Sequence, residues 1–222
     1  MKLLTTNLSL LSLTLLSACS GNQITSDTST NQSRFLAQTY VYHCADNKSF
    51  VARIEPKKAW VFLPTKTLSL PQIPAASGSK FSDGSSTFWN KGETARFTSD
   101  TQFFQNCTNN RTQAIWEHAK LNGVDYRAVG NEPGWSLEIT HDQTTVFIKN
   151  YGQDRYEFKT SKPLIDTAIH TSEYQLQNNA HTLSITLSAK PCADTMSNQS
   201  FSSTVSIRLD NKKFIGCGQV LH

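Results

Sequence analysis

The 222-residue chain lacks the common signatures of enzymes and metal proteins. Its six histidines form no H-E-x-x-H motif and no i,i+4 pair that could hold a metal on a helix. No G-x-S-x-G segment is present, so the sequence has no nucleophile elbow. We therefore predict that the protein is not an enzyme and that it binds no metal and no cofactor.

Neither positive nor negative charge is concentrated in one part of the chain. Residues 40–107 carry eight Lys or Arg against five Asp or Glu, a net +3, and residues 108–222 carry eleven of each, a net zero. A nucleic-acid-binding protein usually has a basic stripe with interleaved aromatic residues. Here the basic residues are scattered, so we expect no nucleic-acid partner.

The start of the chain has an apolar run that is too short and too rich in Ser and Thr for a membrane-spanning helix. Lys2 precedes this uncharged run, which covers residues 3–18. The pattern predicts a cleaved signal peptide over residues 1–18. The run ends in LSAC (16–19), which resembles the bacterial lipobox. An ordinary signal peptide followed by a chance cysteine is the alternative.

The lipobox resemblance implies that Cys19 is acylated and becomes the mature N-terminus. Such a lipid would hold the protein on a membrane without a spanning helix. Ser20 follows where an inner-membrane retention signal of this class would carry Asp. The resemblance therefore implies a lipid anchor in the outer membrane, on its periplasmic face.

The chain has only five cysteines. In an exported chain, an odd number leaves one thiol without a disulfide partner. Assigning Cys19 to the lipid leaves four, for which three pairings are possible. We prefer Cys44–Cys107 with Cys192–Cys217, because each bond then closes one compact segment. An oxidising envelope permits such bonds.

Short alternating apolar runs separated by turn residues dominate the chain after its first 34 residues. They predict an all-β protein with a small antiparallel β-barrel over 35–107 and a second small antiparallel β domain over 124–222. Residues 19–34 hold too few apolar side chains for a core, and we expect a lipidated cysteine and a flexible tether there. Residues 108–123 form the linker.

One helix is predicted within this linker, in TQAIWEHAKLNG (112–123). Its expected apolar side comprises Ala114, Ile115, Trp116 and Ala119, and Gly123 is expected to end it.

A hairpin is predicted over residues 77–97, because Asp83-Gly84 is a strong turn signal between two aromatic runs. A two-residue loop there places Ser77 opposite Asn90. A one-residue bulge near Gly78 or Gly92 would then bring Ser77 and Lys91 onto one face.

Two motifs in this hairpin resemble those of the membrane-bound inhibitors of C-type lysozyme. That family has S-G-x-x-Y followed by K-G-x-x-A on a small antiparallel barrel closed by a disulfide. Here SGSKF (77–81) matches the first motif except at Phe81, which replaces the family's Tyr, and KGETA (91–95) matches the second in full. Cys44 and Cys107 bracket the segment of about 65 residues.

The resemblance implies that Ser77 and Lys91 enter the lysozyme cleft, with Gly78, Gly92 and Phe81 completing the inhibitor site. It makes C-type lysozyme the expected partner and protection of peptidoglycan the expected role. An envelope structural or adhesive lipoprotein that does not touch lysozyme is the alternative.

The second segment has motifs of its own. GNEPGW (130–135), CADTMS (192–197) and GCG (216–218) resemble those of a poorly characterised family of small envelope β domains. The resemblance implies a fold and a location but no activity. Glu132, Asp194 and Trp135 are candidates for lining a pocket, although a turn residue, a helix or turn cap and a core aromatic are their commoner roles.

Overall fold

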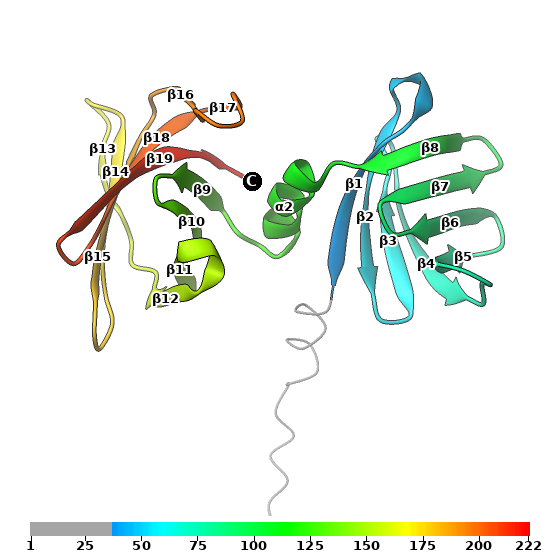
Figure 1. Cartoon of the computed structure of the whole chain (residues 1–222), viewed down its shortest axis with the longest axis horizontal. Coiled ribbons are helices and arrows are strands. Elements are labelled where there is room, and N and C mark those ends of the chain that lie inside the picture. Colours follow the sequence, from blue (N-terminus) through cyan, green and yellow to red (C-terminus); the bar gives the residue numbers. More distant parts are fainter. Residues whose placement is uncertain (1–36) are drawn as a thin grey trace, which may run out of the picture.

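Two antiparallel β units flank one α-helix in the computed structural model, which describes residues 37–222. Figure 1 shows the first unit at the right, the second at the left and the helix between them. The prediction of an all-β fold with a short helix between two β units is confirmed. The predicted signal peptide 1–18, the lipidated Cys19 and the tether 19–34 lie outside the described residues.

The first unit is a closed eight-stranded barrel in which each strand pairs with the next and the last pairs with the first. Its strands are β1 (Gln38–His43), β2 (Ser49–Glu55), β3 (Lys58–Phe62), β4 (Thr67–Ile73), β5 (Ser79–Ser82), β6 (Ser86–Lys91), β7 (Thr94–Ser99) and β8 (Phe103–Asn109), with the 3-10 helix η1 (Ala45–Asn47) after β1.

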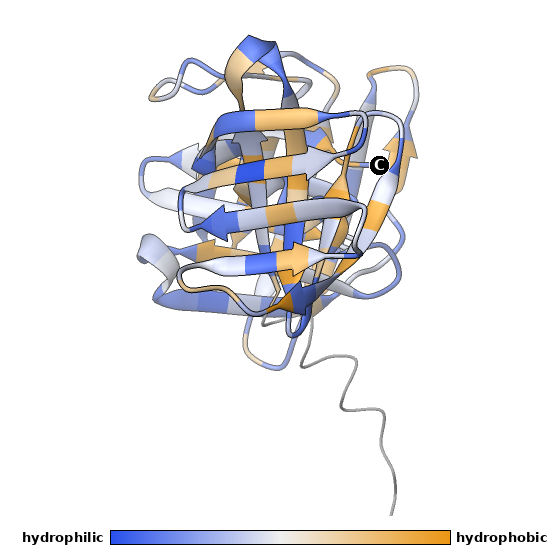
Figure 2. Cartoon of the chain, turned by 90° about the vertical axis from the view of Figure 1, so that its right-hand side faces the viewer, coloured by the Kyte–Doolittle hydropathy of each residue, from blue (hydrophilic) through white to orange (hydrophobic). Residues whose placement is uncertain are grey.

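Side chains alternate between the inside and the outside of this barrel, as the period of two in a strand requires. Figure 2 shows the alternation as blue and orange segments along the strands that face the viewer. The inside is a packed aromatic core whose neighbouring rings lie 5.2–6.1 Å apart between centroids. Its rings belong to Tyr42, Phe50, Phe81, Phe88, Phe97 and Phe104.

The helix α2 (Arg111–Leu121) begins at Asn110, whose side chain accepts a hydrogen bond from the Gln113 N–H. Such a cap satisfies one of the free N–H groups at a helix start. Trp116 and two alanines of the predicted apolar side are buried, but Ile115 is 53% exposed. The expectation for Ile115 is wrong, because this side chain borders a hollow lined by residues of both β units and does not join the cluster in which Trp116 and Ala119 are buried. No described helix has the length and apolar content needed to cross a membrane.

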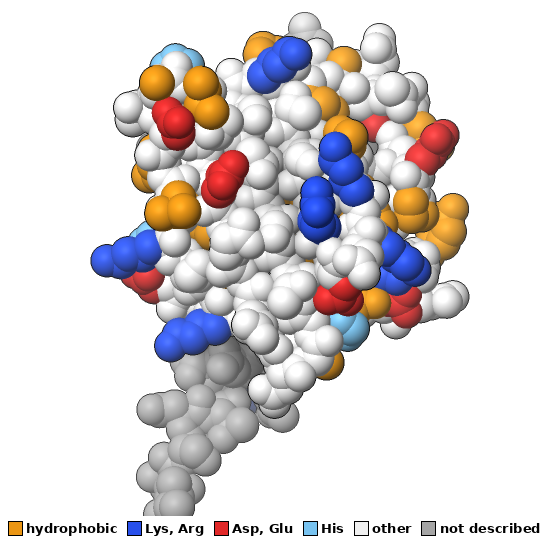
Figure 3. Space-filling view, turned by 90° about the vertical axis from the view of Figure 1, so that its left-hand side faces the viewer, with side chains coloured by type: hydrophobic (Ala, Val, Ile, Leu, Met, Phe, Trp, Pro, Cys, Tyr) orange, Lys and Arg blue, Asp and Glu red, His pale blue; other side chains and the backbone are white. Residues whose placement is uncertain are grey.

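The second unit is a curled nine-stranded sheet in the order β12-β11-β10-β9-β19-β18-β15-β14-β13, with a small two-stranded sheet of β16 and β17 beside it. The elements are β9 (Tyr126–Asn131), β10 (Gly134–Ile139), β11 (Thr144–Lys149), η2 (Asn150–Gly152), β12 (Asp154–Lys159), β13 (Leu164–Asp166), β14 (Thr171–Gln177), β15 (Thr182–Ser188), β16 (Cys192–Ala193), β17 (Ser200–Phe201), β18 (Ser203–Leu209) and β19 (Lys212–Val220). On the face of this unit shown in Figure 3, basic and acidic side chains are interspersed.

Two disulfides are present, Cys44–Cys107 and Cys192–Cys217, in the pairing preferred from the sequence. The first lies beside the seam of the barrel, where β1 and β8 share only two residue pairs. Each bond stays within one β unit.

Candidate functional site

The turn between β6 and β7 presents Lys91 at one end of the barrel. Lys91 pairs with Thr94, so Gly92 and Glu93 form a two-residue turn, and Gly92 has a φ of +66°. Glycine at the first central position is the usual choice for such a hairpin turn. Lys91 itself is exposed.

A buried amide fixes this turn from inside the barrel. Asn90 donates from Nδ2 to the Gly92 carbonyl at 3.1 Å and accepts from the Gly92 N–H at 3.3 Å. Its Nδ2 also donates to the Tyr42 hydroxyl, which in turn donates to the Gly92 carbonyl at 3.3 Å. Burial raises the pKa of the Tyr42 phenol, so this hydroxyl stays a neutral donor. The backbone beside Lys91 is therefore rigidly held.

Glu93, the acidic residue of the same turn, forms its side-chain hydrogen bonds with residues other than Lys91. The Glu93 carboxylate accepts from Arg111 at 3.0 Å and from the Asn109 side chain at 3.1 Å. The bond from Arg111, followed by that from Asn109, lowers the pKa of Glu93. Among residues 37–222 Lys91 has no ion-pair partner, which leaves its ammonium free for a carboxylate of another molecule.

Ser77 lies in the loop between β4 and β5 and is exposed. Gly78 follows with a φ of +66°, and a Cβ there would lie 2.2 Å from the Asn90 carbonyl oxygen and 3.1 Å from Lys91 Cγ. Only glycine allows so close an approach. The Ser-Gly loop thus packs directly against the strand that carries Lys91.

The predicted register of the β5–β6 hairpin is wrong. The strands pair Ser79, not Ser77, with Asn90. The turn is centred one residue later than expected, on Gly84-Ser85: the Asp83 N–H donates to the Ser86 carbonyl at 3.3 Å, and the Asp83 carboxylate accepts from the N–H groups of Ser85 at 3.0 Å and Ser86 at 2.7 Å. These side-chain bonds stabilise the turn at that place. The register shift in this part of the barrel lies between β7 and β8, so no bulge near Gly78 or Gly92 is needed.

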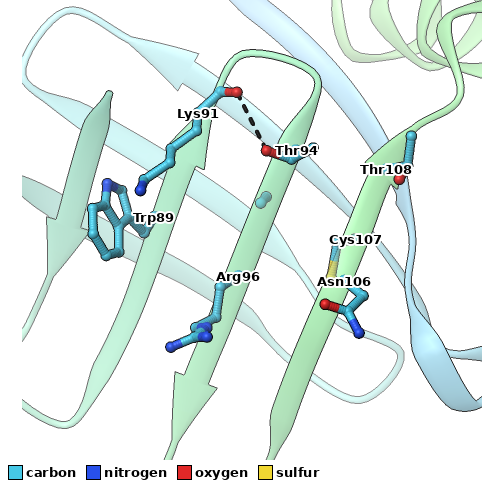
Figure 4. A pocket seen from close by; sticks show the side chains of 8 residues that line it. Trp89, Lys91, Thr94, Arg96, Asn106, Cys107 and Thr108 are labelled. Carbon is cyan, nitrogen blue, oxygen red and sulfur yellow. Dashed lines mark hydrogen bonds between the residues drawn. The ribbon is translucent and has the colours of Figure 1, made fainter. Parts of the chain in front are cut away.

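Trp89 connects the two motifs. Its indole N–H donates to the Ser77 carbonyl at 2.9 Å, and the Lys91 ammonium lies 4.0 Å from the centroid of its ring. Figure 4 shows the Lys91 side chain turned toward Trp89 at the edge of a groove of about 430 Å³. The rest of this groove is lined by Thr94, Ala95, Arg96, Asn106, Cys107 and Thr108, and its lining contains no acidic residue.

Phe81, the residue where the first motif departs from its family, points into the barrel. It is 1% exposed and stacks on Phe88 with a centroid distance of 5.9 Å. It therefore supports the site from the core and cannot contact a partner.

Sequence reasoning missed Trp89 and Asn90. The alternation in STFWNK (86–91) was the available signal, because Phe88 inside requires Asn90 inside and places Trp89 on the same outer face as Lys91. A buried Asn must find hydrogen-bond partners, which here are the Tyr42 hydroxyl and the Gly92 backbone.

The first and third motifs of the second unit meet at Trp135. The ring is 5% exposed and lies across two glycines, since a Cβ at Gly130 would be 2.2 Å from its Nε1 and one at Gly216 would be 2.6 Å from its Cζ2. Trp135 is thus a core residue that needs glycine on β9 and on β19, the strand beyond it, and it is too buried to line an open pocket.

Glu132 and Asp194 do line one small hollow, of about 230 Å³. Asp194 accepts a hydrogen bond from the Asn131 side chain and one from the Ser197 N–H at 2.9 Å. Hydrogen bonding, first from the Ser197 hydroxyl, lowers the pKa of Asp194. These bonds tie the segment after Cys192 to the β9–β10 turn, so the carboxylate already has a structural role.

The described residues hold no cluster of three or more His, Cys, Asp or Glu side chains arranged to bind a metal ion. The site that the first barrel does present is an exposed end with an ammonium, a hydroxyl and the aromatic ring between them. This arrangement is a candidate binding site at one end of a small β-barrel.

Comparison with known proteins finds a family that this barrel matches. Residues 42–102 match the family model described as membrane-bound lysozyme-inhibitor of c-type lysozyme, which confirms the resemblance drawn from the two motifs. Over 59 residues the chain is 44% identical to a membrane-bound lysozyme inhibitor of C-type lysozyme from Yersinia enterocolitica. The match covers 26% of this chain and 50% of that protein, so the chain spans about half the length of the curated relative. No solved structure matches the chain. The resemblance of residues 126–217 to a second family stays a prediction.

The close approach at Gly78 gives a testable expectation. Gly78→Ala should lower the free energy of unfolding by about 2–4 kcal/mol, because the new Cβ meets the Asn90 carbonyl in addition to the left-handed backbone strain. Gly92→Ala is the matched control, since it has the same φ of +66° but nothing within 4 Å of its Cβ position. It should cost only about 1–2 kcal/mol. Equal losses in urea unfolding would show that the loop does not pack as described.

Proposed function

We propose that the protein inhibits C-type lysozyme by inserting Ser77 and Lys91 of its first barrel into the active-site cleft. The observation that carries the proposal is the family match over residues 42–102, which contains both motifs. The geometry supports it, because Ser77 and Lys91 are both exposed at one end of the barrel and both contact Trp89.

The chemistry of the enzyme fits these two side chains. A lysozyme cleft works with two carboxyl groups, one protonated and one ionised. A lysine ammonium offers three donors and a serine hydroxyl one, so together they can bond both carboxyl groups. A charge-assisted hydrogen bond in a desolvated cleft contributes roughly 1.5–3 kcal/mol, or about one to two decades in affinity.

Long-range attraction does not explain binding in this proposal. The barrel segment 40–107 has eight basic and five acidic residues, a net +3, and C-type lysozymes are themselves basic. Two positive partners gain no electrostatic steering. Recognition then depends on fit and on the short-range contacts of Lys91.

We also propose that a lipid on Cys19 anchors the protein to the periplasmic face of the outer membrane. The lipobox-like sequence at residues 16–19 supports this, as does the term membrane-bound in the family description. An inhibitor held there would meet lysozyme before the enzyme reaches peptidoglycan.

A turbidity assay tests the inhibition. Purified protein lacking its first 19 residues should slow the lysis of a cell-wall suspension by C-type lysozyme, with a raised apparent KM and an unchanged kcat. That pattern is expected because an occupied cleft excludes substrate. Reduced and heat-unfolded protein is the control. Lysis at the full rate with folded protein in excess would overturn the proposal and favour an adhesive or structural lipoprotein.

A further inference from the structure

Trp89 occupies a position between the two motifs that neither motif includes. It lies on β6, two residues before Lys91, so both side chains emerge on the outer face of the barrel. One edge of the indole donates to the Ser77 carbonyl at 2.9 Å, and the ring lies 4.0 Å from the Lys91 ammonium. A single side chain thus contacts both residues of the proposed inhibitor site.

We propose that Trp89 is a positioning residue for lysozyme inhibition, an inference that rests on the function proposed above. A free lysine side chain on a surface populates many rotamers, and binding must pay for ordering it. The indole face attracts the ammonium through a cation–π contact and restricts it before the enzyme arrives. Affinity gained in this way comes from preorganisation rather than from a new contact with the partner.

The indole N–H orders the second half of the site. Ser77 sits in a loop whose next residue, Gly78, packs against Asn90 and Lys91. The bond from Trp89 to the Ser77 carbonyl fixes this loop on the same strand. Trp89 therefore sets the spacing between the hydroxyl and the ammonium, which must match the spacing of two carboxyl groups.

A second tryptophan of the barrel provides a matched comparison. Trp60 on β3 is also partly exposed, donates its indole N–H to Glu55 at 3.4 Å and has the Lys58 ammonium 4.8 Å from its ring centroid. Its contacts are of the same kind, but they involve neither Ser77 nor Lys91. If a tryptophan with such contacts only stabilised the barrel, replacing Trp60 and replacing Trp89 should have similar effects on inhibition.

The test compares four proteins in the lysozyme assay, each alone and combined with Lys91→Ala. Trp89→Leu should weaken inhibition about tenfold, since both contacts are lost, and Trp89→Phe about threefold, since the ring remains. Trp60→Leu should stay within about twofold of the wild type. With Lys91 already replaced, Trp89→Leu should cost only about threefold, because the Lys91 ammonium that the ring restricts is then absent; the Lys80 ammonium, 5.6 Å from the same ring centroid, is present in both backgrounds.

Nuclear magnetic resonance supplies a readout that does not depend on lysozyme. In the wild type, the ring current of Trp89 should shift the signals of the Lys91 side-chain methylenes upfield. The shift should vanish in Trp89→Leu, persist in Trp89→Phe and be unchanged in Trp60→Leu. Dispersed spectra of the same samples show that each variant is folded.

Three results would overturn the inference. The first is a folded Trp89→Leu that inhibits within twofold of the wild type while Lys91→Ala does not. The second is a tenfold cost of Trp89→Leu that persists with Lys91 replaced, which would make the ring a direct contact of the enzyme. The third is full inhibition by Lys91→Ala itself. It would disprove the proposed inhibitor site, and the positioning role of Trp89 would fall with it.

Discussion

Replacing Lys91 with alanine should weaken inhibition of C-type lysozyme by about one to two decades while the barrel stays folded. The ammonium is exposed and, within residues 37–222, pairs with no carboxylate, so its removal breaks no ion pair of the described protein. In the complex the same change would leave an ionised carboxylate of the enzyme without its donor. Inhibition constants and thermal midpoints of the two proteins measure both effects.

Two further variants separate charge from shape. Lys66 lies in the turn after β3, at the opposite end of the barrel from the turns after β4 and β6, and is exposed. Lys66→Ala removes one positive charge as well, but it should leave inhibition unchanged. Ser77→Ala should weaken inhibition less than Lys91→Ala, because it removes one neutral donor. If Lys66→Ala and Lys91→Ala weakened inhibition equally, Lys91 would contribute only through the net charge of the protein.

Removing the Cys44–Cys107 disulfide should lower the free energy of unfolding of the first barrel by about 4 kcal/mol. The two cysteines are 63 residues apart, and the chain-entropy estimate grows with loop length. The bond also lies at the barrel seam, where β1 and β8 share only two residue pairs. Because small domains are stable by about 5–15 kcal/mol in total, this loss is a large fraction. Urea unfolding of Cys44→Ala/Cys107→Ala measures it.

The second disulfide is the natural control for that experiment. Cys192 and Cys217 are 25 residues apart, so the double alanine variant should lose about 3.5 kcal/mol. The loss should fall on the transition of the second β unit, since the bond joins the segment after β15 to β19. A single unfolding transition that shifts equally in both variants would show that the units do not unfold separately. Peptide mapping that joined Cys44 to Cys192 would contradict both pairings.

Much of this fold follows from local patterns that the sequence displays directly. The period of two in runs such as STFW predicts strands, and Gly123, with a φ of +81°, follows the helix end as expected. The Lys-Gly turn could also be predicted, because Gly92 supplies the positive φ that a tight hairpin needs.

The register of the Ser-Gly hairpin could not be predicted in the same way. It depends on the Asp83 carboxylate, which accepts from the N–H groups of Ser85 and Ser86 and stabilises a turn centred one residue later than expected. The partner of Asn90 therefore moves by two residues, from Ser77 to Ser79, which keeps each side chain on its face but changes which residues lie opposite one another. The contact of Trp89 with Ser77 depends on this register, so the centre of the site emerged only from the structure.

The central claim is that Ser77 and Lys91 together carry inhibition. Its most direct test is the inhibition constant of the double variant Ser77→Ala/Lys91→Ala, measured beside its circular dichroism and thermal midpoint. We expect a folded protein whose midpoint matches the wild type and whose inhibition is weaker than that of either single variant. A folded double variant that inhibits C-type lysozyme as strongly as the wild type would contradict the assignment.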